Sequence, residues 1–199
     1  LVRDAHKRLE GVVTETPLQY NKRLSLLYGA RIFLKREDLQ IVRSYKLRGA
    51  YNCISKLSHS ERERGVVCAS AGNHAQGVAF SCAKLSVKGW IYMPKNTPKQ
   101  KVERVRVLGG AWITIELIGD TFDDSYGHAK TFCEKESRVF VHPFDNEYVA
   151  AGQGTVAEEF MRQLEQKPDV VVVPIGGGGL VAGVSTYVKD ISPETQIIG

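Results

Sequence analysis

The feature that most constrains the fold of this 199-residue chain is a regular alternation of short apolar segments with segments of helical spacing. The apolar runs at 65–69 and 170–173, for example, are each followed by a turn and then by apolar residues that recur every three or four positions. Such alternation is typical of parallel βαβ units with helices on both faces of a sheet. We therefore expect an α/β fold built on parallel or mixed sheets.

The pattern predicts the elements of the whole chain. We expect strands at 31–35, 65–69, 87–93, 111–115, 138–141, 170–173 and 196–198. We expect helices at 3–10, 20–28, 45–58, 73–85, 99–108, 121–136, 146–166 and 180–190. No helix follows the last strand, so we expect the chain to be a piece of a longer protein that is inactive or weakly folded by itself.

Composition and charge limit the classes of function. Apolar residues make up 43% and charged residues 25%, as in a soluble globular protein. No apolar run reaches the ~20 residues of a membrane span, and the N-terminus has no signal-peptide pattern. The net charge is +5, and residues 95–106 hold five basic residues against one acidic residue. This segment has no aromatic residue, so it predicts a solvated helix face rather than a nucleic-acid site.

The four cysteines, Cys53, Cys68, Cys82 and Cys133, have no C-x-x-C spacing. This spacing does not predict a zinc site or any other metal site. The first three lie among apolar neighbours and are expected to be small core residues. The simplest interpretation is a reduced, cytoplasmic protein.

The stretch Ser44-Tyr45-Lys46-Leu47-Arg48-Gly49-Ala50 opens one of the predicted helices, with Ser44 as its N-cap. Lys46 then lies in the first turn, where the helix dipole disfavours a cation by about 0.3–1 kcal/mol. A lysine that works as a neutral amine, in an imine or as a base, avoids this penalty. The stretch alone leaves an ordinary solvated lysine open.

The loop Ser70-Ala71-Gly72-Asn73-His74-Ala75-Gln76-Gly77 joins the end of a strand to the start of a helix. Its small residues expose backbone N–H groups where the dipole favours an anion, which suits a substrate carboxylate. Asn73 can donate a hydrogen bond to a ligand oxygen. The alternative is a capped turn in which Asn73 is the cap and His74 is structural.

A run of four glycines, Gly176 to Gly179, separates another strand from a helix that begins with Leu180. Four glycines are costly in chain entropy, and a glycine turn before a helix is suited to holding a phosphate. The pattern Gly177-x-Gly179-x-x-Ala182 also fits a dinucleotide-binding turn. That alternative expects an acidic residue about 20 positions later, beyond the last residue, so the loop alone leaves both ligands open.

Together the three stretches resemble the threonine dehydratases, which are pyridoxal-phosphate enzymes of the tryptophan-synthase-β fold type. Residues 44–50, 70–77 and 176–180 occur in the order seen in that family. The flanking residues 34–40, 142–145 and 151–155 resemble it as well, so the resemblance spans essentially the whole chain. Tyr45 and Ile41 depart from the usual Phe and Pro, and neither change removes a catalytic group.

The resemblance implies a role for each stretch. Lys46 would bond covalently to pyridoxal 5′-phosphate and then act as the base at the substrate Cα, with Ser44 and Tyr45 beside the ring. Asn73 would bond the 3′-oxygen of the pyridine. The phosphate would lie on Gly176, Gly177, Gly178, Gly179 and Leu180. The substrate carboxylate would lie among Ser70, Ala71, Gly72 and His74, with some contacts through backbone N–H groups.

The implied reaction converts L-threonine to 2-oxobutanoate and ammonia, and L-serine to pyruvate, with the first step of isoleucine synthesis preferred because residues 35–49 look closer to the biosynthetic type. Serine racemases of this fold have a serine where this chain has Ala71, and alanine has no proton to give to Cα. This favours elimination. The alternatives are a catabolic dehydratase, a serine racemase, a non-catalytic pseudoenzyme and, from another class, a dinucleotide-binding protein.

The resemblance also implies two domains with the cofactor in the cleft between them. Residues 1–52 and 146–199 would form part of a large pyridoxal-phosphate-binding domain, and 53–145 a small substrate-binding domain. We expect an amino-acid substrate, no nucleic-acid or membrane partner, no metal, and a homo-oligomer, either a dimer or a tetramer.

Overall fold

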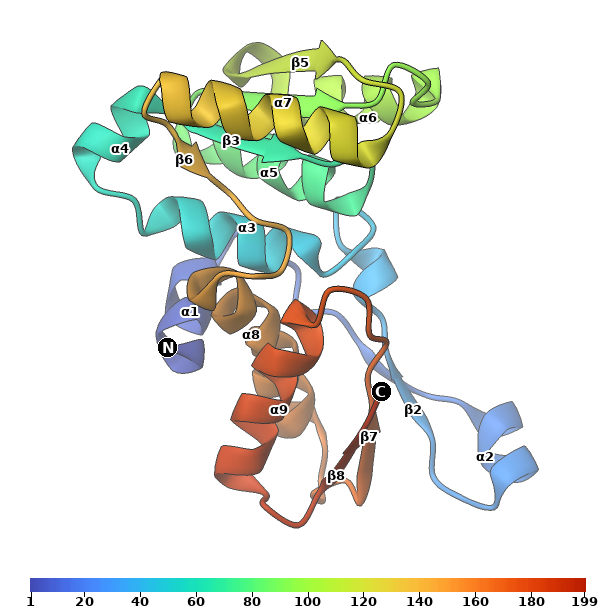
Figure 1. Ribbon diagram of the computed structural model, residues 1–199. Helices are drawn as coiled ribbons and strands as arrows, with labels where there is room; N and C mark the ends of the chain where they lie inside the picture. Colours follow the sequence, from blue (N-terminus) through green and yellow to red (C-terminus); the bar gives the residue numbers. More distant parts are fainter.

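The computed structural model describes residues 1–199 (Figure 1). The strands are β1 (Leu18–Tyr20), β2 (Phe33–Lys35), β3 (Val66–Ala69), β4 (Gly89–Met93), β5 (Ile113–Leu117), β6 (Val139–Phe140), β7 (Val170–Val172) and β8 (Gln196–Ile198). The α-helices are α1 (Val2–Leu9), α2 (Lys22–Tyr28), α3 (Lys46–Ser55), α4 (His59–Arg64), α5 (Asn73–Leu85), α6 (Lys99–Gly109), α7 (Phe122–Lys135), α8 (Glu147–Gln163) and α9 (Gly179–Ile191). The short 3-10 helices are η1 (Glu37–Leu39) and η2 (Gly110–Trp112).

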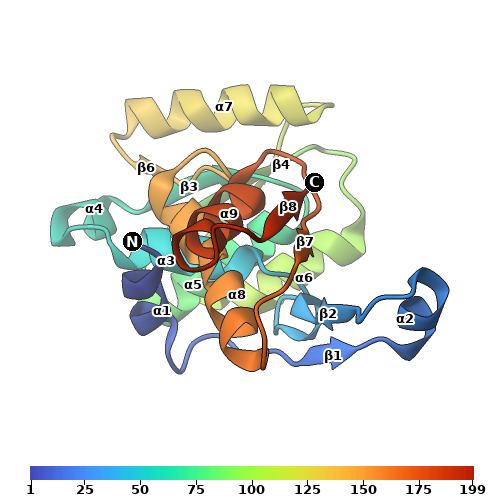
Figure 2. The same cartoon turned by 90° about the horizontal axis from the view of Figure 1, so that it is seen from below.

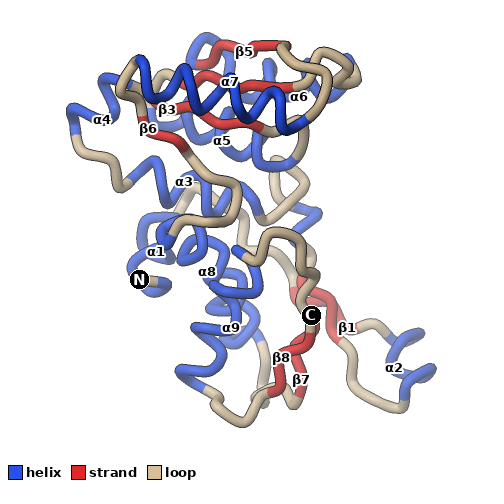
Figure 3. The backbone as a smooth tube through the Cα atoms, viewed as in Figure 1, coloured by secondary structure: helices blue, strands red, loops and turns tan.

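The strands form three sheets, as the tube drawing in Figure 3 shows. The largest is entirely parallel and has the order β5-β4-β3-β6. β7 and β8 form a second parallel pair, and β1 and β2 an antiparallel pair. The predicted α/β class built on parallel sheets is confirmed, and no sheet mixes parallel and antiparallel pairs. The alternation of strands and helices did not predict the antiparallel pair, because β1 has only three residues and follows Pro17.

Helices cover both faces of the four-stranded sheet, with α7 on one face and α5 and α6 on the other (Figure 2). The main core lies between this sheet and the helices α5 and α6. It includes Val66, Cys68 and Ile91 from the strands and Val78 from α5. Ala50 and Ile54 of α3 belong to the same core. α3 therefore packs between α5 and α8 and joins the upper and lower parts of Figure 1.

The pair β7–β8 packs against α8 and α9 through one of its two faces. Val171 and Ile197 contact the cluster formed by these helices, which includes Phe160 and Val184. Side chains alternate along a strand, so the next residue, Val172, points the other way and is 75% exposed. The apolar run at 170–173 is thus half-covered rather than buried on both faces.

Two predictions about local structure were wrong. Ser44 is not the N-cap of α3, because the helix begins after Tyr45, which makes no side-chain cap; the Ser44 hydroxyl is instead buried without a hydrogen-bond partner. The helix α4 was not predicted because its sequence contains no apolar residue. Its signal was the capping box, in which Ser58 and Glu61 bond each other's backbone N–H groups.

All four cysteines are free and buried, as predicted for the first three. They lie in α3, β3, α5 and α7. The longest helix, α8, has 17 residues, and no helix combines the length and the hydrophobicity of a membrane span.

Candidate active site

Lys46 is the first residue of α3, and burial favours its neutral form. Its Nζ atom donates a hydrogen bond to the carbonyl oxygen of Pro143 at 2.7 Å and lies 5.5 Å from the centre of the Tyr45 ring. Neither neighbour is a carboxylate, so neither offsets the loss of water around an ammonium group. Burial consequently holds the pKa of Lys46 below its usual value.

The glycine loop, residues 176–179, joins β7 to α9 and leaves the first turn of α9 without a side-chain cap. Gly178 is the N-cap, and its φ of +88° is a left-handed conformation that favours glycine. A Cβ atom added at Gly176 or Gly178 would meet nothing within 4 Å. The loop therefore offers its backbone N–H groups, with that of Leu180, beside open space, where the helix dipole favours an anion.

Phe144 connects the glycine loop to Lys46. A Cβ atom added at Gly177 would lie 2.1 Å from Cδ1 of Phe144, and one added at Gly179 would lie 2.9 Å from Cα of Phe144. Only glycine lets the loop approach this residue so closely. Because Pro143 accepts the hydrogen bond of Lys46, the lysine and the glycine loop contact consecutive residues of one turn.

The loop after β3 brings the start of α5 to the same helix α3. Gly72 is the N-cap of α5 and provides no side-chain cap, and the next residue, Asn73, is exposed. One turn later, a Cβ atom added at Gly77 would lie 3.0 Å from the carbonyl oxygen of Lys46. Glycine at this position allows α5 to pack against the backbone of the lysine.

The residues between β3 and Asn73 form a short, half-buried turn. The Ser70 hydroxyl accepts a hydrogen bond from the N–H of Gly72 at 3.2 Å, and Ala71 lies between them. The turn ends at the uncapped first turn of α5. The N–H of Ser70 is bonded to the carbonyl oxygen of Tyr92, so the free N–H groups are those of Ala71 and of the first turn of α5, which suit an anion such as a carboxylate.

The side chain of His74 is buried and bonds the protein backbone, although its motif suggested a place beside the ligand. Its side chain is 3% exposed, and its Nε2 atom bonds the carbonyl oxygen of Val141 at 2.8 Å. Burial lowers the pKa of His74 to about 4, with a smaller contribution from the charges of Lys46 and His142. The imidazole is therefore neutral, with Nε2 turned toward the residue after β6 and Nδ1 buried without a partner, and the backbone N–H of His74 remains available at the start of α5.

Arg48 anchors the segment that carries Lys46. It is fully buried, lies two residues after Lys46 in the first turn of α3, and its guanidinium group contacts two carboxylates. The Nε and Nη2 atoms each bond Glu37 at 2.8 Å, and the Nη1 atom bonds Glu159 of α8 at 2.6 Å. Lys35 bonds the second oxygen of Glu159 at 2.7 Å. The two cations and two carboxylates tie α3 to η1, β2 and α8.

The electrostatics of this cluster favour the charged form of Glu37, whereas burial lowers the pKa of Lys35. Burial raises the pKa of Glu37, but the hydrogen bonds and charge of Arg48 outweigh it, so the pKa of Glu37 lies below its usual value. No role was predicted for Arg48 from the sequence, although it is part of the Lys46 motif. The sequence signal for a buried arginine here is that its neighbours along the helix are apolar or small.

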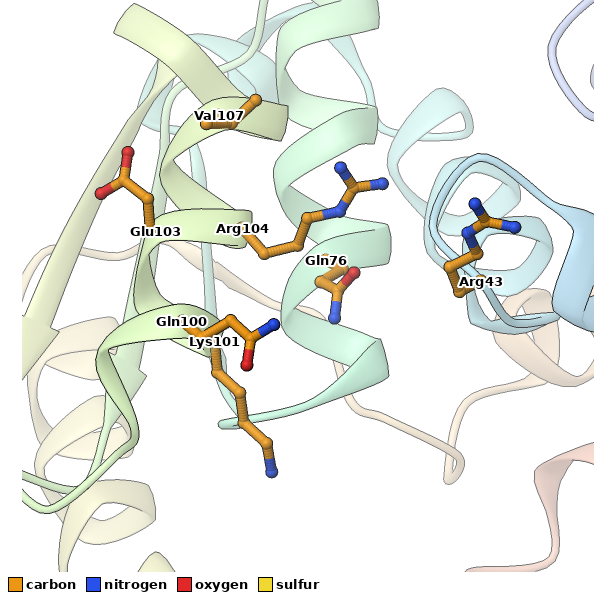
Figure 4. A pocket seen from close by; sticks show the side chains of 7 residues that line it. All are labelled: Arg43, Gln76, Gln100, Lys101, Glu103, Arg104 and Val107. Carbon is orange, nitrogen blue, oxygen red and sulfur yellow. The ribbon is translucent and has the colours of Figure 1, made fainter.

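The basic segment 95–106 belongs largely to α6 and borders a hollow of about 520 Å³ (Figure 4). Lys101 and Arg104 lie on one side of it, and Arg43 lies on the other. Arg104 donates a hydrogen bond to the carbonyl oxygen of Ile41 at 2.7 Å. The predicted solvated face thus also fastens α6 to the loop that precedes Lys46.

The chain belongs to the family of pyridoxal-phosphate-dependent enzymes, since the family model described as "Pyridoxal-phosphate dependent enzyme" matches residues 9–199. It is 55% identical over 194 residues to the biosynthetic L-threonine dehydratase IlvA of Bacillus subtilis, covering 98% of this chain and 46% of that protein. It is 53% identical to the enzyme of the same name from Lactococcus lactis, covering 100% of this chain and 48% of that protein. The chain thus spans about half the length of these relatives.

Solved structures show the same fold. The processed form of threonine deaminase isoform 2 from Solanum lycopersicum superposes with a TM-score of 0.93 at 45% identity, covering 100% of this chain and 54% of that one. Maize serine racemase superposes with a TM-score of 0.91 at 34% identity, covering 98% of this chain and 58% of that one. The family match decides between the two cofactors that the glycine loop had left open.

The residues present fit pyridoxal phosphate. Lys46 offers an amine that burial makes less basic, and the uncapped glycine loop offers N–H groups beside open space at Gly176 and Gly178. The exposed side chain of Asn73 and the buried, unpartnered hydroxyl of Ser44 are polar groups free to bond a ligand. Pro143, Phe144 and Gly77 make the contacts that join Lys46 to the glycine loop and to α5. No role was predicted for these three residues, because their contacts come from elements distant in the sequence.

Proposed function

We propose that the protein is a biosynthetic threonine dehydratase, which converts L-threonine to 2-oxobutanoate and ammonia for isoleucine synthesis and also accepts L-serine to give pyruvate. The observation that carries the proposal is Lys46, a half-buried lysine whose neighbouring turn, Pro143–Phe144, packs directly on the glycine loop. The names of the curated relatives support the substrate and the biosynthetic type.

Each predicted site residue has a place in this proposal. Gly176 to Gly179 and Leu180 bind the phosphate through their N–H groups, and the amide of Asn73 bonds the 3′-oxygen of the pyridine. Ser44 and Tyr45 flank the ring. The substrate carboxylate lies among Ser70, Ala71, Gly72 and His74. It is bound through the free N–H groups of Ala71 and His74 and the O–H of Ser70, because the N–H groups of Ser70 and Gly72 already donate to Tyr92 and to the Ser70 hydroxyl. When bound, pyridoxal phosphate supplies an electron sink for the charge that develops at the substrate Cα.

Lys46 is proposed both to hold the cofactor covalently and to move the proton at Cα. A free lysine has a pKa near ~10.4, and a base working near pH 7 needs a value about 3 units lower, a bias of about 4 kcal/mol. Burial shifts the pKa of Lys46 in this direction. The Pro143 carbonyl accepts a hydrogen bond from Nζ and orients its lone pair without adding a negative charge.

Ala71 supports elimination rather than racemisation. Inverting Cα requires a second group that gives a proton to the opposite face, and a methyl side chain has no such proton. Serine racemases share the fold at 34–35% identity, so the choice of reaction rests on individual side chains rather than on the architecture.

The test is Lys46→Ala in the protein produced at its full natural length, with Lys56→Ala as the control. Lys56 ends the same helix, and its Nζ lies 5.5 Å from the Tyr148 ring. We expect Lys46→Ala to abolish 2-oxobutanoate formation and also the covalent attachment of the cofactor that is made permanent by borohydride reduction. We expect Lys56→Ala to keep both. Attachment and turnover that persist in Lys46→Ala would refute the assignment.

We also propose the expected domains, location and assembly. Residues 53–145, which contain the whole four-stranded sheet, form the small domain, and 1–52 with 146–199 form part of the large one. Four free cysteines support a cytoplasmic protein. The arm β1–α2–β2 exposes Leu26, Leu27 and Tyr28, which supports a homo-oligomer. Sedimentation of the monomer alone at micromolar concentration would contradict the last point.

A further inference from the structure

The turn formed by residues 142–145 joins β6 to α8 and carries both contacts between Lys46 and the glycine loop. The carbonyl oxygen of Pro143 accepts the hydrogen bond from Lys46, and Phe144 fills the space above Gly177. The positions of these two groups depend on the shape of the turn. What fixes that shape also fixes the distance between the lysine and the phosphate-binding loop.

His142 holds the turn through one ring nitrogen. Its Nδ1 atom accepts a hydrogen bond from the N–H of Asp145 at 2.8 Å and a longer one from the N–H of Phe144 at 3.4 Å. The His142 ring also packs edge-on against the Phe144 ring, with 4.6 Å between the ring centres. Because Nδ1 accepts from two donors, the imidazole must be neutral, with its proton on Nε2.

We propose that His142 is a positioning residue of the active site, whose neutral imidazole keeps Pro143 against Lys46 and Phe144 against the glycine loop. The inference rests on the proposed function for what the turn serves, whereas the hydrogen bonds of the turn stand independently of it. Protonation at Nδ1 would put a third donor against two N–H groups, so the turn would open as His142 becomes charged.

Several groups around His142 set the pH at which this happens. They are Lys130 and Tyr126 of α7, Lys46 of α3, His74 of α5 and Asp145 of the turn. Burial lowers the pKa of His142; the Asp145 carboxylate opposes this shift, and the charges of Lys130 and Lys46 reinforce it. A histidine with a lowered pKa stabilises its surroundings above about pH 6.5, its usual pKa, and this stabilisation is lost progressively as the pH falls below it.

Two variants separate the acceptor atom from the ring. His142→Asn keeps an oxygen that can accept from the N–H groups two and three residues later, as in an Asx turn, and it does not titrate. His142→Phe keeps an aromatic ring beside Phe144 and removes the acceptor. The first measurement is hydrogen exchange of the Phe144 and Asp145 amides in the cofactor-free, full-length protein at pH 7.5 and pH 5. The amide of Ile91, in the buried strand β4, is the internal reference for global opening.

We expect the parent protein to lose protection at Phe144 and Asp145, relative to Ile91, between pH 7.5 and pH 5. His142→Phe should lose about tenfold protection at both pH values, the effect of one or two neutral hydrogen bonds, and His142→Asn should keep it at both. The second measurement is the affinity for pyridoxal phosphate at pH 7.5, which should fall about tenfold in His142→Phe and stay near the parent value in His142→Asn.

Two results would overturn the inference: unchanged protection and cofactor affinity in His142→Phe, or a loss in His142→Asn at least as large as that in His142→Phe, which would show that the acceptor atom does not hold the turn. If the parent protein binds no pyridoxal phosphate while the exchange pattern appears as expected, the proposed function fails and the role of His142 in holding the turn stands.

Discussion

Removing the guanidinium group of Arg48 tests whether the buried charge cluster fixes the helix that carries Lys46. In Arg48→Met the chain keeps a long apolar stem, but Glu37 and Glu159 lose their shared cation. Glu159 retains Lys35 at 2.7 Å, whereas Glu37 retains no contacting cation and only neutral donors, the hydroxyl of Thr16 at 2.6 Å and the amide of Gln40 at 3.4 Å. Breaking one partner out of a buried ionic group costs about 3–5 kcal/mol, since a buried charge is left unpaired.

Arg162 provides a matched control on α8, the helix that also carries Glu159. It also contacts two carboxylates, Glu15 and Glu158, but its side chain is 49% exposed. Exposed pairs contribute about 0–1 kcal/mol, so Arg162→Met should change the free energy of unfolding little. Urea denaturation followed by Trp90 and Trp112 fluorescence measures both variants. With an m-value of about 3 kcal/mol/M, Arg48→Met should lower the midpoint by about 1 M or more.

The pH dependence of the free energy of unfolding provides a second test of the Arg48–Glu37 interaction, with a defined direction. In the parent protein Arg48 holds the pKa of Glu37 below its usual value, so the stabilisation is complete above about pH 4.3 and is lost as the pH falls through the folded-state pKa. In Arg48→Met, burial raises the pKa of Glu37 and is opposed by the Thr16 hydrogen bond and the Lys35 charge without Arg48, so this pKa rises relative to the parent and the stabilisation from Glu37 above about pH 4.3 becomes smaller. Adding Glu37→Gln should restore part of the loss, because a neutral amide replaces the unpaired carboxylate.

The reasoning fails if Arg48→Met and Arg162→Met differ by less than about 1 kcal/mol, a difference within the range of exposed pairs. It also fails if the double variant Arg48→Met/Glu37→Gln is no more stable than Arg48→Met. The double variant remains measurable where the single variant is too unstable to purify.

Two glycine substitutions test the backbone of the glycine loop and the packing of α3 on α8. Gly178→Ala forces a side chain into a left-handed conformation, at a cost of about 1–2 kcal/mol, and should weaken cofactor binding. Gly110→Ala, at the end of α6, also has a positive φ and open space around an added Cβ atom, so it is the control in the same titration. Gly49→Ala places a Cβ atom 2.4 Å from Nε2 of Gln153 and 2.7 Å from the carbonyl oxygen of Val149, so it should cost about 1–3 kcal/mol of overpacking in thermal unfolding. Equal affinities for the first pair, or an unchanged melting temperature for Gly49→Ala, would contradict the geometry.

Local signals in the sequence predicted the regular elements well. The Asn73–Leu85 helix was predicted to the residue, and the helix predicted at 20–28 ends at Tyr28, where the left-handed glycine Gly29 follows. The helix α4 has no apolar face, so hydrophobic periodicity could not reveal it. The antiparallel pairing of β1 with β2 depends on the return of the chain after α2, which three-residue strands do not signal.

The site divides in the same way. Lys46, Asn73 and the glycine loop lie at helix starts, which sequence patterns mark. The packing of Phe144 on Gly177, the hydrogen bond from Lys46 to Pro143 and the acceptor role of His142 arise only when distant elements meet. A periodic pattern carries no information on such contacts, because it describes one segment at a time.

The four buried thiols can report local opening of the fold through their rates of chemical labelling. Burial raises the pKa of Cys53 to about 11 and that of Cys82 to about 12, so almost no reactive thiolate exists in the closed fold. Alkylation at each thiol must wait for its element to separate from the core. Because Cys53 lies in α3 and Cys133 in α7, their labelling rates compare the loosening of the lysine-bearing helix with that of the outer layer of the sheet.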